Sequence, residues 1–243
     1  MNLIIEQGNT TAKIAIFDRW DMVNMLVYKE FDVRKAEALF KQYPLINGIY
    51  STVKAPDCQL MDSLKKQLEY FLMLDSHTAL PLRICYETPQ TLGSDRIAAA
   101  TGANYLRPGR NVLVIDAGTA ITYEVIEATG VYIGGNISPG METRFKALHQ
   151  FTDKLPCVEV CDNVPLWGTS TETAILAGVV NGMVYEMDGY IDEMQKKYSD
   201  VFVFLTGGHS FYFERRLKNT IFADANLVMV GLNRILEYNV EKQ

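Results

Sequence analysis

Apolar runs separated by polar turns divide this chain into two halves that share one order of predicted elements. The first half opens with an apolar run that turns at Gly8 and returns as a second strand, and the second half opens in the same way around Gly118. In each half a third strand, a helix and a buried strand follow. The pattern therefore predicts two α/β lobes with a cleft between them.

The same pattern sets bounds for the elements. Apolar runs bounded by turn residues predict strands at 3–6, 12–17, 22–28, 46–53, 82–86, 112–115, 120–126, 132–137 and 201–205. Helical composition or periodicity predicts helices at 34–42, 61–72, 95–105, 142–150, 171–198 and 227–238. We expect a break in the long helix near Gly178 or Gly182, and close packing of the alanine-rich helix at 95–105. The turn signal at 107–110 predicts lobes at 1–108 and 109–243.

Both strand–turn units carry residue types that bind nucleotide phosphates. They read Glu6-Gln7-Gly8-Asn9-Thr10-Thr11-Ala12-Lys13 and Asp116-Ala117-Gly118-Thr119-Ala120-Ile121-Thr122. A carboxylate at a strand end can hold a magnesium ion directly or through water, and glycine lets backbone N–H groups approach an anion. One copy alone could equally be a hairpin turn that needs a glycine. Two copies in corresponding halves favour phosphate and metal binding, with Lys13 as either a phosphate-side cation or a solvated residue.

A third segment, Tyr86 to Arg96, places Asp95 and Arg96 at a predicted helix start. Asp95 could accept a proton from a hydroxyl group, and Arg96 could bind a carboxylate or phosphate through two parallel hydrogen bonds. Spacing alone favours a plainer interpretation, in which Ser94 or Asp95 caps the helix and Arg96 is solvated. Thr206-Gly207-Gly208-His209 follows a buried strand, and its glycines would let a flat nucleotide base approach the backbone; an ordinary loop explains them equally well.

Composition narrows the class of protein. The chain has 243 residues, of which 48% are hydrophobic, enough for one large domain or two compact lobes. A formal net charge of −6 without an arginine-rich stretch argues against a nucleic-acid or anionic-membrane surface. Since neither a signal peptide nor a membrane-length apolar run is recognisable, we expect a soluble cytoplasmic protein. The four cysteines lack metal-ligand spacing and predict free, buried thiols.

In combination, these motifs resemble the type III pantothenate kinases of the actin, hexokinase and acetate-kinase superfamily. Further matching pieces are Ser51 with Val53, Gly134-Gly135-x-Ile137-x-Pro139-Gly140, Gly168-x-x-Thr171 and Leu227-x-x-x-Gly231-Leu232. The pieces follow the family order over essentially the whole chain, and the combination is specific although each piece is weak. The resemblance implies two ribonuclease H-like (actin-like ATPase) lobes, with mixed sheets flanked by helices and an active-site cleft between them.

The resemblance also implies an activity, the ATP-dependent phosphorylation of the primary hydroxyl of pantothenate to 4'-phosphopantothenate, the first step of coenzyme A biosynthesis. Asp95 matches the family's proton acceptor. An alcohol is too weak an acid for Asp95 to deprotonate beforehand, so positioning and charge neutralisation dominate. The matching substrate-binding positions are Tyr86, Gly93, Ser94, Asp95, Arg96 and Thr171. The expected ATP-binding positions are Glu6, Gln7, Gly8, Asn9, Thr10, Thr11, Ala12, Lys13, Thr119, Gly207 and Gly208.

Bound cations and a homodimer follow from the same resemblance. Asp116 matches the carboxylate that binds a monovalent cation, K⁺ or NH₄⁺. Glu6 stands where the family usually has aspartate, and its side chain is longer by one methylene. Because magnesium demands tight octahedral geometry, this departure can alter metal preference or ATP binding; we hypothesise that Glu6 still serves Mg²⁺ or another divalent cation. The family's pantothenate pocket lies at or near the boundary between the two subunits.

Two alternatives stay open at the level of sequence. The first is a kinase of the same fold that acts on another small hydroxy acid, which the Tyr86–Arg96 segment argues against. The second is a non-catalytic nucleotide-binding regulator, because relatives of the family have been described as transcriptional accessory proteins. The presence of both Asp95 and Asp116 disfavours a dead enzyme, whereas Glu6 keeps that alternative open.

Overall fold

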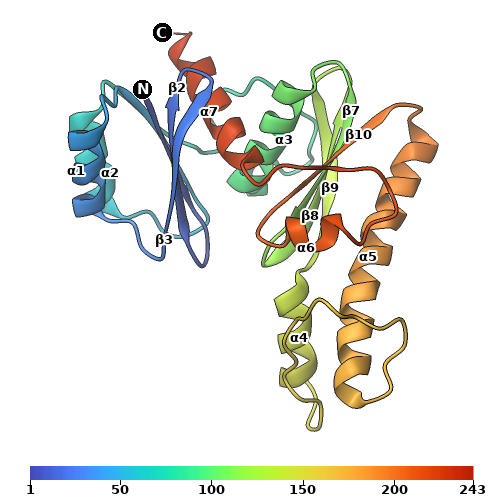
Figure 1. Ribbon diagram of the computed structural model, residues 1–243. Coiled ribbons are helices and arrows are strands. Elements are labelled where there is room, and N and C mark those ends of the chain that lie inside the picture. The colour runs from blue at the N-terminus through green and yellow to red at the C-terminus, as the bar shows by residue number, and fades with distance from the viewer. Residues whose placement is uncertain (243) are drawn as a thin grey trace. The chain divides into compact units, whose positions relative to one another are not determined.

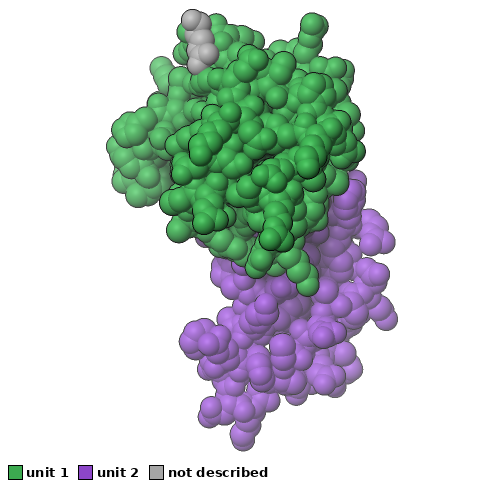
Figure 2. Space-filling view, turned by 90° about the vertical axis from the view of Figure 1, so that its left-hand side faces the viewer, with its two compact units in different colours: residues 1–108, 130–133, 226–243 green, residues 109–129, 134–225 purple. Residues whose placement is uncertain are grey.

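Two compact units make up the protein. The computed structural model describes residues 1–242. Unit 1 comprises residues 1–108, 130–133 and the segment from Asn226 on, and unit 2 comprises residues 109–129 and 134–225. Figure 1 labels the elements, and Figure 2 colours unit 1 green and unit 2 purple. The boundary between the units after Pro108 falls where the sequence predicts a lobe boundary. Residues 130–133 and the segment from Asn226 on belong to unit 1, however, and this differs from the predicted lobe at 109–243.

A five-stranded mixed sheet forms the centre of unit 1, in the order β3-β2-β1-β4-β5. Its strands are β1 (Asn2–Gln7), β2 (Ala12–Asp18), β3 (Asp21–Tyr28), β4 (Asn47–Thr52) and β5 (Tyr70–Met73). The central strand β1 pairs antiparallel with β2 and parallel with β4. A tight turn suffices for the first pairing, whereas the second needs a crossover, which contains helix α1 (Val33–Gln42).

Helices cover both faces of this sheet (Figure 1). On one face α1 and α2 (Cys58–Gln67) pack on alternate strand residues, so that Leu3 and Ile5 share a core cluster with Leu39 and Leu64. On the other face lie α3 (Ser94–Leu106) and α7 (Leu227–Val240). The short elements are the 3-10 helix η1 (Pro89–Thr91) and β6 (Arg83–Ile84). Strand β6 pairs parallel with the first residues of β9 (Val131–Pro139), which also belong to unit 1.

Small residues bring α3 and α7 into close contact. A Cβ atom on Gly231 would overlap the Ala98 carbonyl oxygen, and one on Gly102 would overlap the Leu227 carbonyl oxygen. The predicted close packing of the alanine-rich helix is therefore confirmed. This packing is also the physical reason why the C-terminal helix belongs to unit 1 and not to the predicted second lobe.

Unit 2 repeats the arrangement around a second mixed sheet, whose full strand order is β11-β10-β7-β8-β9-β6. Its other strands are β7 (Asn111–Ala117), β8 (Ala120–Glu127), β10 (Val201–Thr206) and β11 (Phe222–Ala223). The central strand β7 pairs antiparallel with β8 and parallel with β10. β7 thus has the same kinds of neighbours as β1, which confirms the repeated strand order predicted from the sequence.

The helices of unit 2 are α4 (Met141–Gln150), α5 (Thr171–Lys197) and α6 (Ser210–Glu214). Ser170 caps α5 by accepting a hydrogen bond from the Thr173 N–H. The buried face of α5 supplies much of the unit 2 core. The predicted break is wrong, since α5 runs unbroken through Gly178 and Gly182, whose Cβ positions face open space. Packing of its apolar face outweighs the low helix propensity of these glycines.

Two further predictions are wrong in part. The helix predicted at 61–72 begins earlier, after the cap Asp57, and ends at Gln67, while Tyr70–Met73 forms strand β5 against β4. A short apolar run such as this one fits either type of element, and pairing with β4 decides. The four cysteines are free, as predicted, but exposed and not buried. In the part of the chain that the structure describes, no helix is long and apolar enough to cross a membrane.

Candidate active-site residues

Each central strand places a carboxylate beside a buried hydroxyl residue. In unit 1, Glu6 on β1 lies opposite Lys13 on β2 and Ser51 on β4. In unit 2, Asp116 on β7 lies opposite a threonine on both neighbours, including Thr206 on β10. The sheets therefore present two equivalent strand ends, each with one acidic residue at the carboxyl end of a parallel strand pair, where ligands of α/β proteins commonly bind.

The turns that follow these strands keep polar side chains at their tips. The Gly8 N–H donates a hydrogen bond of 3.0 Å to the Thr11 carbonyl oxygen, and the Gly118 N–H donates one of 3.0 Å to the Ala120 carbonyl oxygen. Asn9, Thr10 and Thr119 are exposed. These amide and hydroxyl groups are available to a ligand at the tip of each turn.

A glycine lies against each carboxylate, and at Gly207 the backbone requires it. A Cβ atom on Gly8 would lie only 3.2 Å from Glu6 Oε1. Gly207 has a φ of +93°, a conformation that side chains disfavour, and a Cβ atom there would overlap Asp116 Oδ1 and lie 2.6 Å from the Ala117 carbonyl oxygen. Gly207 thus lies directly against the Asp116 strand end, whereas Gly208 is exposed.

Asp95 is the second residue of α3. Its Oδ1 atom accepts a hydrogen bond of 2.8 Å from the Arg96 N–H, and a Cβ atom on Gly93 would lie 2.5 Å from the same oxygen. The carboxylate therefore lies over Gly93, where a side chain would displace it. No side chain caps the helix from Gly93; Ser94 instead accepts a hydrogen bond of 2.9 Å from the Ser51 hydroxyl.

Arg96 is buried and not solvated, because it extends into an aromatic cluster. Its Nη2 atom donates a hydrogen bond of 3.0 Å to the Tyr132 hydroxyl. Its guanidinium carbon lies 5.8 Å from the centre of the Tyr86 ring, and the two tyrosine rings are 6.1 Å apart. The Cys85 N–H donates to the Tyr132 carbonyl oxygen at 2.9 Å, so that Tyr132 fixes the segment that carries Tyr86.

Thr171 is the exposed first residue of α5 and lines a groove of about 870 Å³ between α4 and α5. Pro139, Thr143 and Phe151 line the same groove. The Thr143 hydroxyl donates a hydrogen bond of 2.8 Å to the Thr119 carbonyl oxygen, and the Gly140 N–H donates one of 3.0 Å. The start of α4 therefore connects the groove to the turn at Thr119.

The described residues contain no cluster of three or more His, Cys, Asp and Glu side chains that could hold a metal ion. Magnesium is commonly held by one or two carboxylates together with substrate phosphates and water. A single carboxylate at each strand end fits this mode of binding and does not fit a metal cage built from protein alone.

The sequence-predicted residues are divided between the two units. Unit 1 contains the Glu6–Lys13 turn, Tyr86 and the segment Gly93–Arg96; unit 2 contains Asp116, Thr119, Thr171 and Gly207-Gly208. The contacts of Tyr132 and Thr143 were missed. Local sequence offers no signal for Tyr132, which is 36 residues from Arg96 in the chain and is placed beside the Tyr86 segment by the pairing of β6 with β9. Thr143 was open to prediction, because it follows Pro139-Gly140 at a predicted helix start, and a hydroxyl group beside a turn often forms a hydrogen bond with the backbone.

Several solved structures share this fold. A Campylobacter jejuni protein described as a Baf family transcriptional activator has a TM-score of 0.63 and 22% identity, with 98% of this chain and 99% of that chain covered. Lmo2764 from Listeria monocytogenes, described as an N-acetylmannosamine kinase, has a TM-score of 0.56 and 9% identity, with 99% of each chain covered. The activator of 2-hydroxyisocaproyl-CoA dehydratase from Clostridium difficile, solved with bound ADPNP, has a TM-score of 0.52 and 12% identity, with 99% of this chain and 94% of that chain covered.

The fold is thus shared with a protein described as a kinase and with a dehydratase activator solved with bound ADPNP. The model of the type III pantothenate kinase family matches residues 2–193. The chain belongs to the type III pantothenate kinase family and is an enzyme of that kind, which phosphorylates pantothenate with ATP and a divalent cation. Type III pantothenate kinases from Phocaeicola vulgatus and Bacteroides fragilis are 51% and 50% identical to it; 98% of this chain is covered in both cases, with 99% and 98% of the relatives.

Proposed function

We propose that this kinase transfers the γ-phosphoryl group of ATP to the primary hydroxyl of pantothenate, with Asp95 as the proton acceptor. The observation that supports this reaction is the membership of the chain in the type III pantothenate kinase family. In the proposed step the hydroxyl oxygen forms a bond to the γ-phosphorus, the bond to the β–γ bridging oxygen breaks, and ADP leaves. The hydroxyl proton passes to the Asp95 carboxylate as the phosphoryl group arrives, because an alcohol is too weak an acid to ionise first.

The environment of Asp95 supports this role. One carboxylate oxygen is held by the Arg96 N–H, which fixes the orientation of the group at the start of α3. Positioning of this kind supplies much of the rate in phosphoryl transfer, because the protein performs little covalent chemistry itself. Asp95→Asn should therefore lower kcat strongly while leaving the affinity for ATP nearly unchanged.

The proposed ATP contacts are the residues of the strand-end turns and of the glycine pair after β10. These are Glu6, Gln7, Gly8, Asn9, Thr10, Thr11, Ala12, Lys13, Thr119, Gly207 and Gly208. A bound divalent cation would neutralise charge that develops on the phosphates, and Glu6 is the proposed contact to it. Asp116, enclosed by the Gly207 backbone, is the proposed ligand of a monovalent cation, K⁺ or NH₄⁺. For pantothenate, the proposed contacts are Tyr86, Gly93, Ser94, Asp95, Arg96 and Thr171.

A homodimer in the cytoplasm is proposed as the working form. An apolar surface along α5 supports self-association: Leu166, Trp167 and Tyr185 are 62%, 81% and 61% exposed, and they line a groove over Gly178 and Gly182. Large exposed apolar side chains around small residues are typical of protein interfaces. Trp167→Glu should shift the mass measured by light scattering from dimer to monomer. The net charge of −6 supports our expectation that neither nucleic acid nor membrane is a partner.

The deciding experiment is a coupled ADP-release assay with pantothenate, Mg²⁺ and K⁺. Release that depends on pantothenate, with 4'-phosphopantothenate identified by mass spectrometry, supports the proposal. Release with a different hydroxy acid would indicate another kinase of this fold. ATP binding without any release would indicate a nucleotide-binding regulator.

The same assay tests Glu6. If Glu6 serves the divalent cation, Glu6→Gln raises the Mg²⁺ concentration needed for half-maximal rate, and Glu6→Asp retains activity. An unimpaired Glu6→Gln variant would refute the metal role.

A further inference from the structure

Ser51 is a hydroxyl residue in an apolar part of β4. Its side chain is 2% exposed, and it directly follows the buried residues Ile49 and Tyr50. A buried hydroxyl is unfavourable unless it forms a hydrogen bond. Ser51 forms one with Ser94, where its Oγ atom donates to Ser94 Oγ at 2.9 Å. This contact links the carboxyl end of β4 to the first residue of α3.

The first turn of α3 depends on such tertiary contacts. Gly93 precedes it and has no side chain with which to cap the helix, and no proline stiffens the turn. Asp95 lies one residue after Ser94, with its carboxylate over Gly93. Rotation or fraying of this turn would therefore move the Asp95 carboxylate directly.

The other end of the link lies at Glu6. Ser51 is the register partner of Glu6 in the parallel pairing of β4 with β1. The hydrogen bond from Ser51 to Ser94 therefore ties the turn that carries Asp95 to the strand end that carries Glu6. All of these residues belong to unit 1. In unit 2 the position opposite Asp116 is occupied by Thr206, which is also buried and also carries a hydroxyl.

We propose that Ser51 is a positioning residue for phosphoryl transfer, which holds Asp95 at a fixed place relative to the Glu6 strand end through Ser94. This inference rests on the roles proposed above for Asp95 and Glu6. Ser51 touches neither substrate in this proposal and acts through Ser94 alone. Its loss should reduce kcat more than it changes the KM for ATP.

A double-mutant cycle tests the link in the full-length enzyme. Ser51→Ala should lower kcat about ten-fold, the order expected for a small misplacement of a reacting group, with the KM for ATP within about two-fold of its original value. In the double variant Ser51→Ala/Ser94→Ala, kcat should be no lower than with Ser94→Ala alone, because one bond is lost in either case. Ser51→Thr, which keeps the hydroxyl as at Thr206, should recover most of the rate.

Ser63→Ala is the matched control, since Ser63 lies on α2 in unit 1 and its hydroxyl accepts a hydrogen bond of 3.0 Å from the Gln67 side chain. It should leave kcat unchanged. A Ser51→Ala variant with full kcat, or effects of the two serines that simply add, would overturn the proposal.

Amide hydrogen exchange separates this inference from the proposed function. Ser51→Ala should speed exchange of the amides at 94–98 relative to those of the Ser63→Ala variant, whatever substrate the enzyme uses. Unchanged exchange there would overturn the link even in an active pantothenate kinase. Faster exchange in a protein without pantothenate kinase activity would keep the link and reject the function.

Discussion

Arg96 and Tyr132 are joined by a hydrogen bond of 3.0 Å between the guanidinium Nη2 atom and the phenol oxygen, and both side chains are buried. The tyrosine hydroxyl is a neutral acceptor, so it orients the guanidinium without adding a charge of its own. Since Tyr132 also packs against Tyr86, two residues proposed to bind pantothenate depend on one strand residue.

Tyr132→Phe removes this hydroxyl while the ring remains. One lost hydrogen bond is worth about 1 kcal/mol, so we expect the KM for pantothenate to rise about five-fold. If Arg96 binds the pantothenate carboxylate, the KM for an analogue with a carboxamide in place of that carboxylate should be the same for Tyr132→Phe as for the original enzyme. The control is Tyr123→Phe, which removes another buried tyrosine hydroxyl, one that donates to Glu186 in unit 2. It should leave the KM for pantothenate and the KM for the carboxamide analogue unchanged. Equal rises for acid and amide would contradict the role of Arg96.

Gly207→Ala should impair both stability and the response to K⁺. A left-handed conformation costs a non-glycine residue about 1–2 kcal/mol, and the new Cβ atom would displace the Asp116 carboxylate. We therefore expect a lower Tm and a weaker dependence of the rate on K⁺ concentration. Gly189→Ala, at a helical position with open space around its Cβ atom, should instead raise Tm slightly. A Gly207→Ala enzyme with an unaltered K⁺ titration would argue against cation binding at Asp116.

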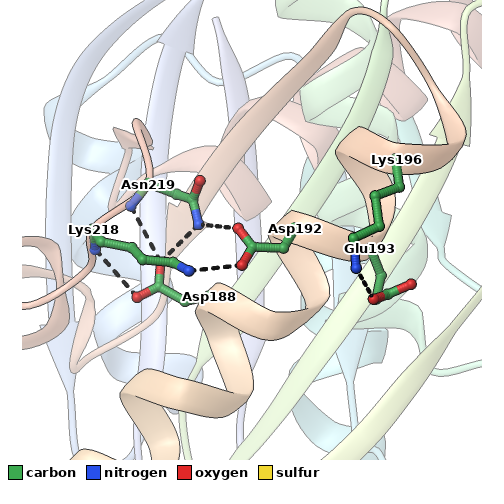
Figure 3. Close-up of polar contacts among 6 residues, drawn as sticks. All are labelled: Asp188, Asp192, Glu193, Lys196, Lys218 and Asn219. Carbon is green, nitrogen blue, oxygen red and sulfur yellow. Dashed lines mark hydrogen bonds and ion pairs between the residues drawn. The ribbon is translucent and has the colours of Figure 1, made fainter.

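Asp188 anchors the loop after α6, as Figure 3 shows. This buried carboxylate accepts hydrogen bonds from the backbone N–H groups of Lys218 and Asn219, both at 3.2 Å, and from the Asn219 side chain at 2.9 Å. Asp188→Ala would leave these donors without their partner, and we expect a loss of about 3 kcal/mol in unfolding free energy. Denaturant titration measures this loss. The half-exposed neighbour Asp192, changed to alanine, should have a much smaller effect.

The ion pair of Lys218 with Asp192 predicts a shallow dependence of stability on pH. The hydrogen bond of 2.7 Å from Lys218 Nζ lowers the pKa of Asp192 and raises the pKa of Lys218. The Asp192 contribution is therefore present above the unfolded pKa of 3.8 and is lost as pH falls through the lower folded value. The Lys218 contribution is present below 10.5 and is lost as pH rises through the higher folded value.

Asp192→Asn should accordingly lower Tm slightly at neutral pH, with the difference from the original protein vanishing at strongly acidic and strongly alkaline pH. Added salt should shrink the difference at neutral pH, because the pair is exposed and therefore screened. A difference that persists at pH 2 would show that the asparagine acts by some means other than charge.

Much of the fold follows from local patterns. The hairpins at Gly8 and Gly118 and the repeated strand order were predictable because alternation and turn glycines act over a few residues. Strand β5 was not predictable, since its four apolar residues become a strand only by pairing with β4. The continuity of α5 through its glycines likewise depends on the core beneath it.

In the candidate site too, local sequence indicates some residues, whereas the contacts between distant segments could not be predicted. Glu6 and Asp95 stand close to Gly8 and Gly93 in the sequence, and the structure shows that a side chain at either glycine would crowd the carboxylate. The glycine that would crowd Asp116 is Gly207, which is distant in the sequence. The contacts that hold these groups come from distant parts of the chain, such as Ser51 to Ser94 and Tyr132 to Arg96. Such pairs follow from sheet topology, which no local spacing encodes.

The packing of α7 on the sheet of unit 1 has a consequence for folding during synthesis. Asn233 receives a hydrogen bond of 2.9 Å from Asn2, and Asn239 donates one of 2.9 Å to the Ala79 carbonyl oxygen. Strand β1 therefore waits for α7, which follows it by more than 200 residues in the chain, before its surroundings are complete. At a synthesis rate of about 5–20 residues per second, the nascent sheet of unit 1 spends many seconds with one apolar face covered by α3 but not yet by α7, a period in which chaperones have most to protect.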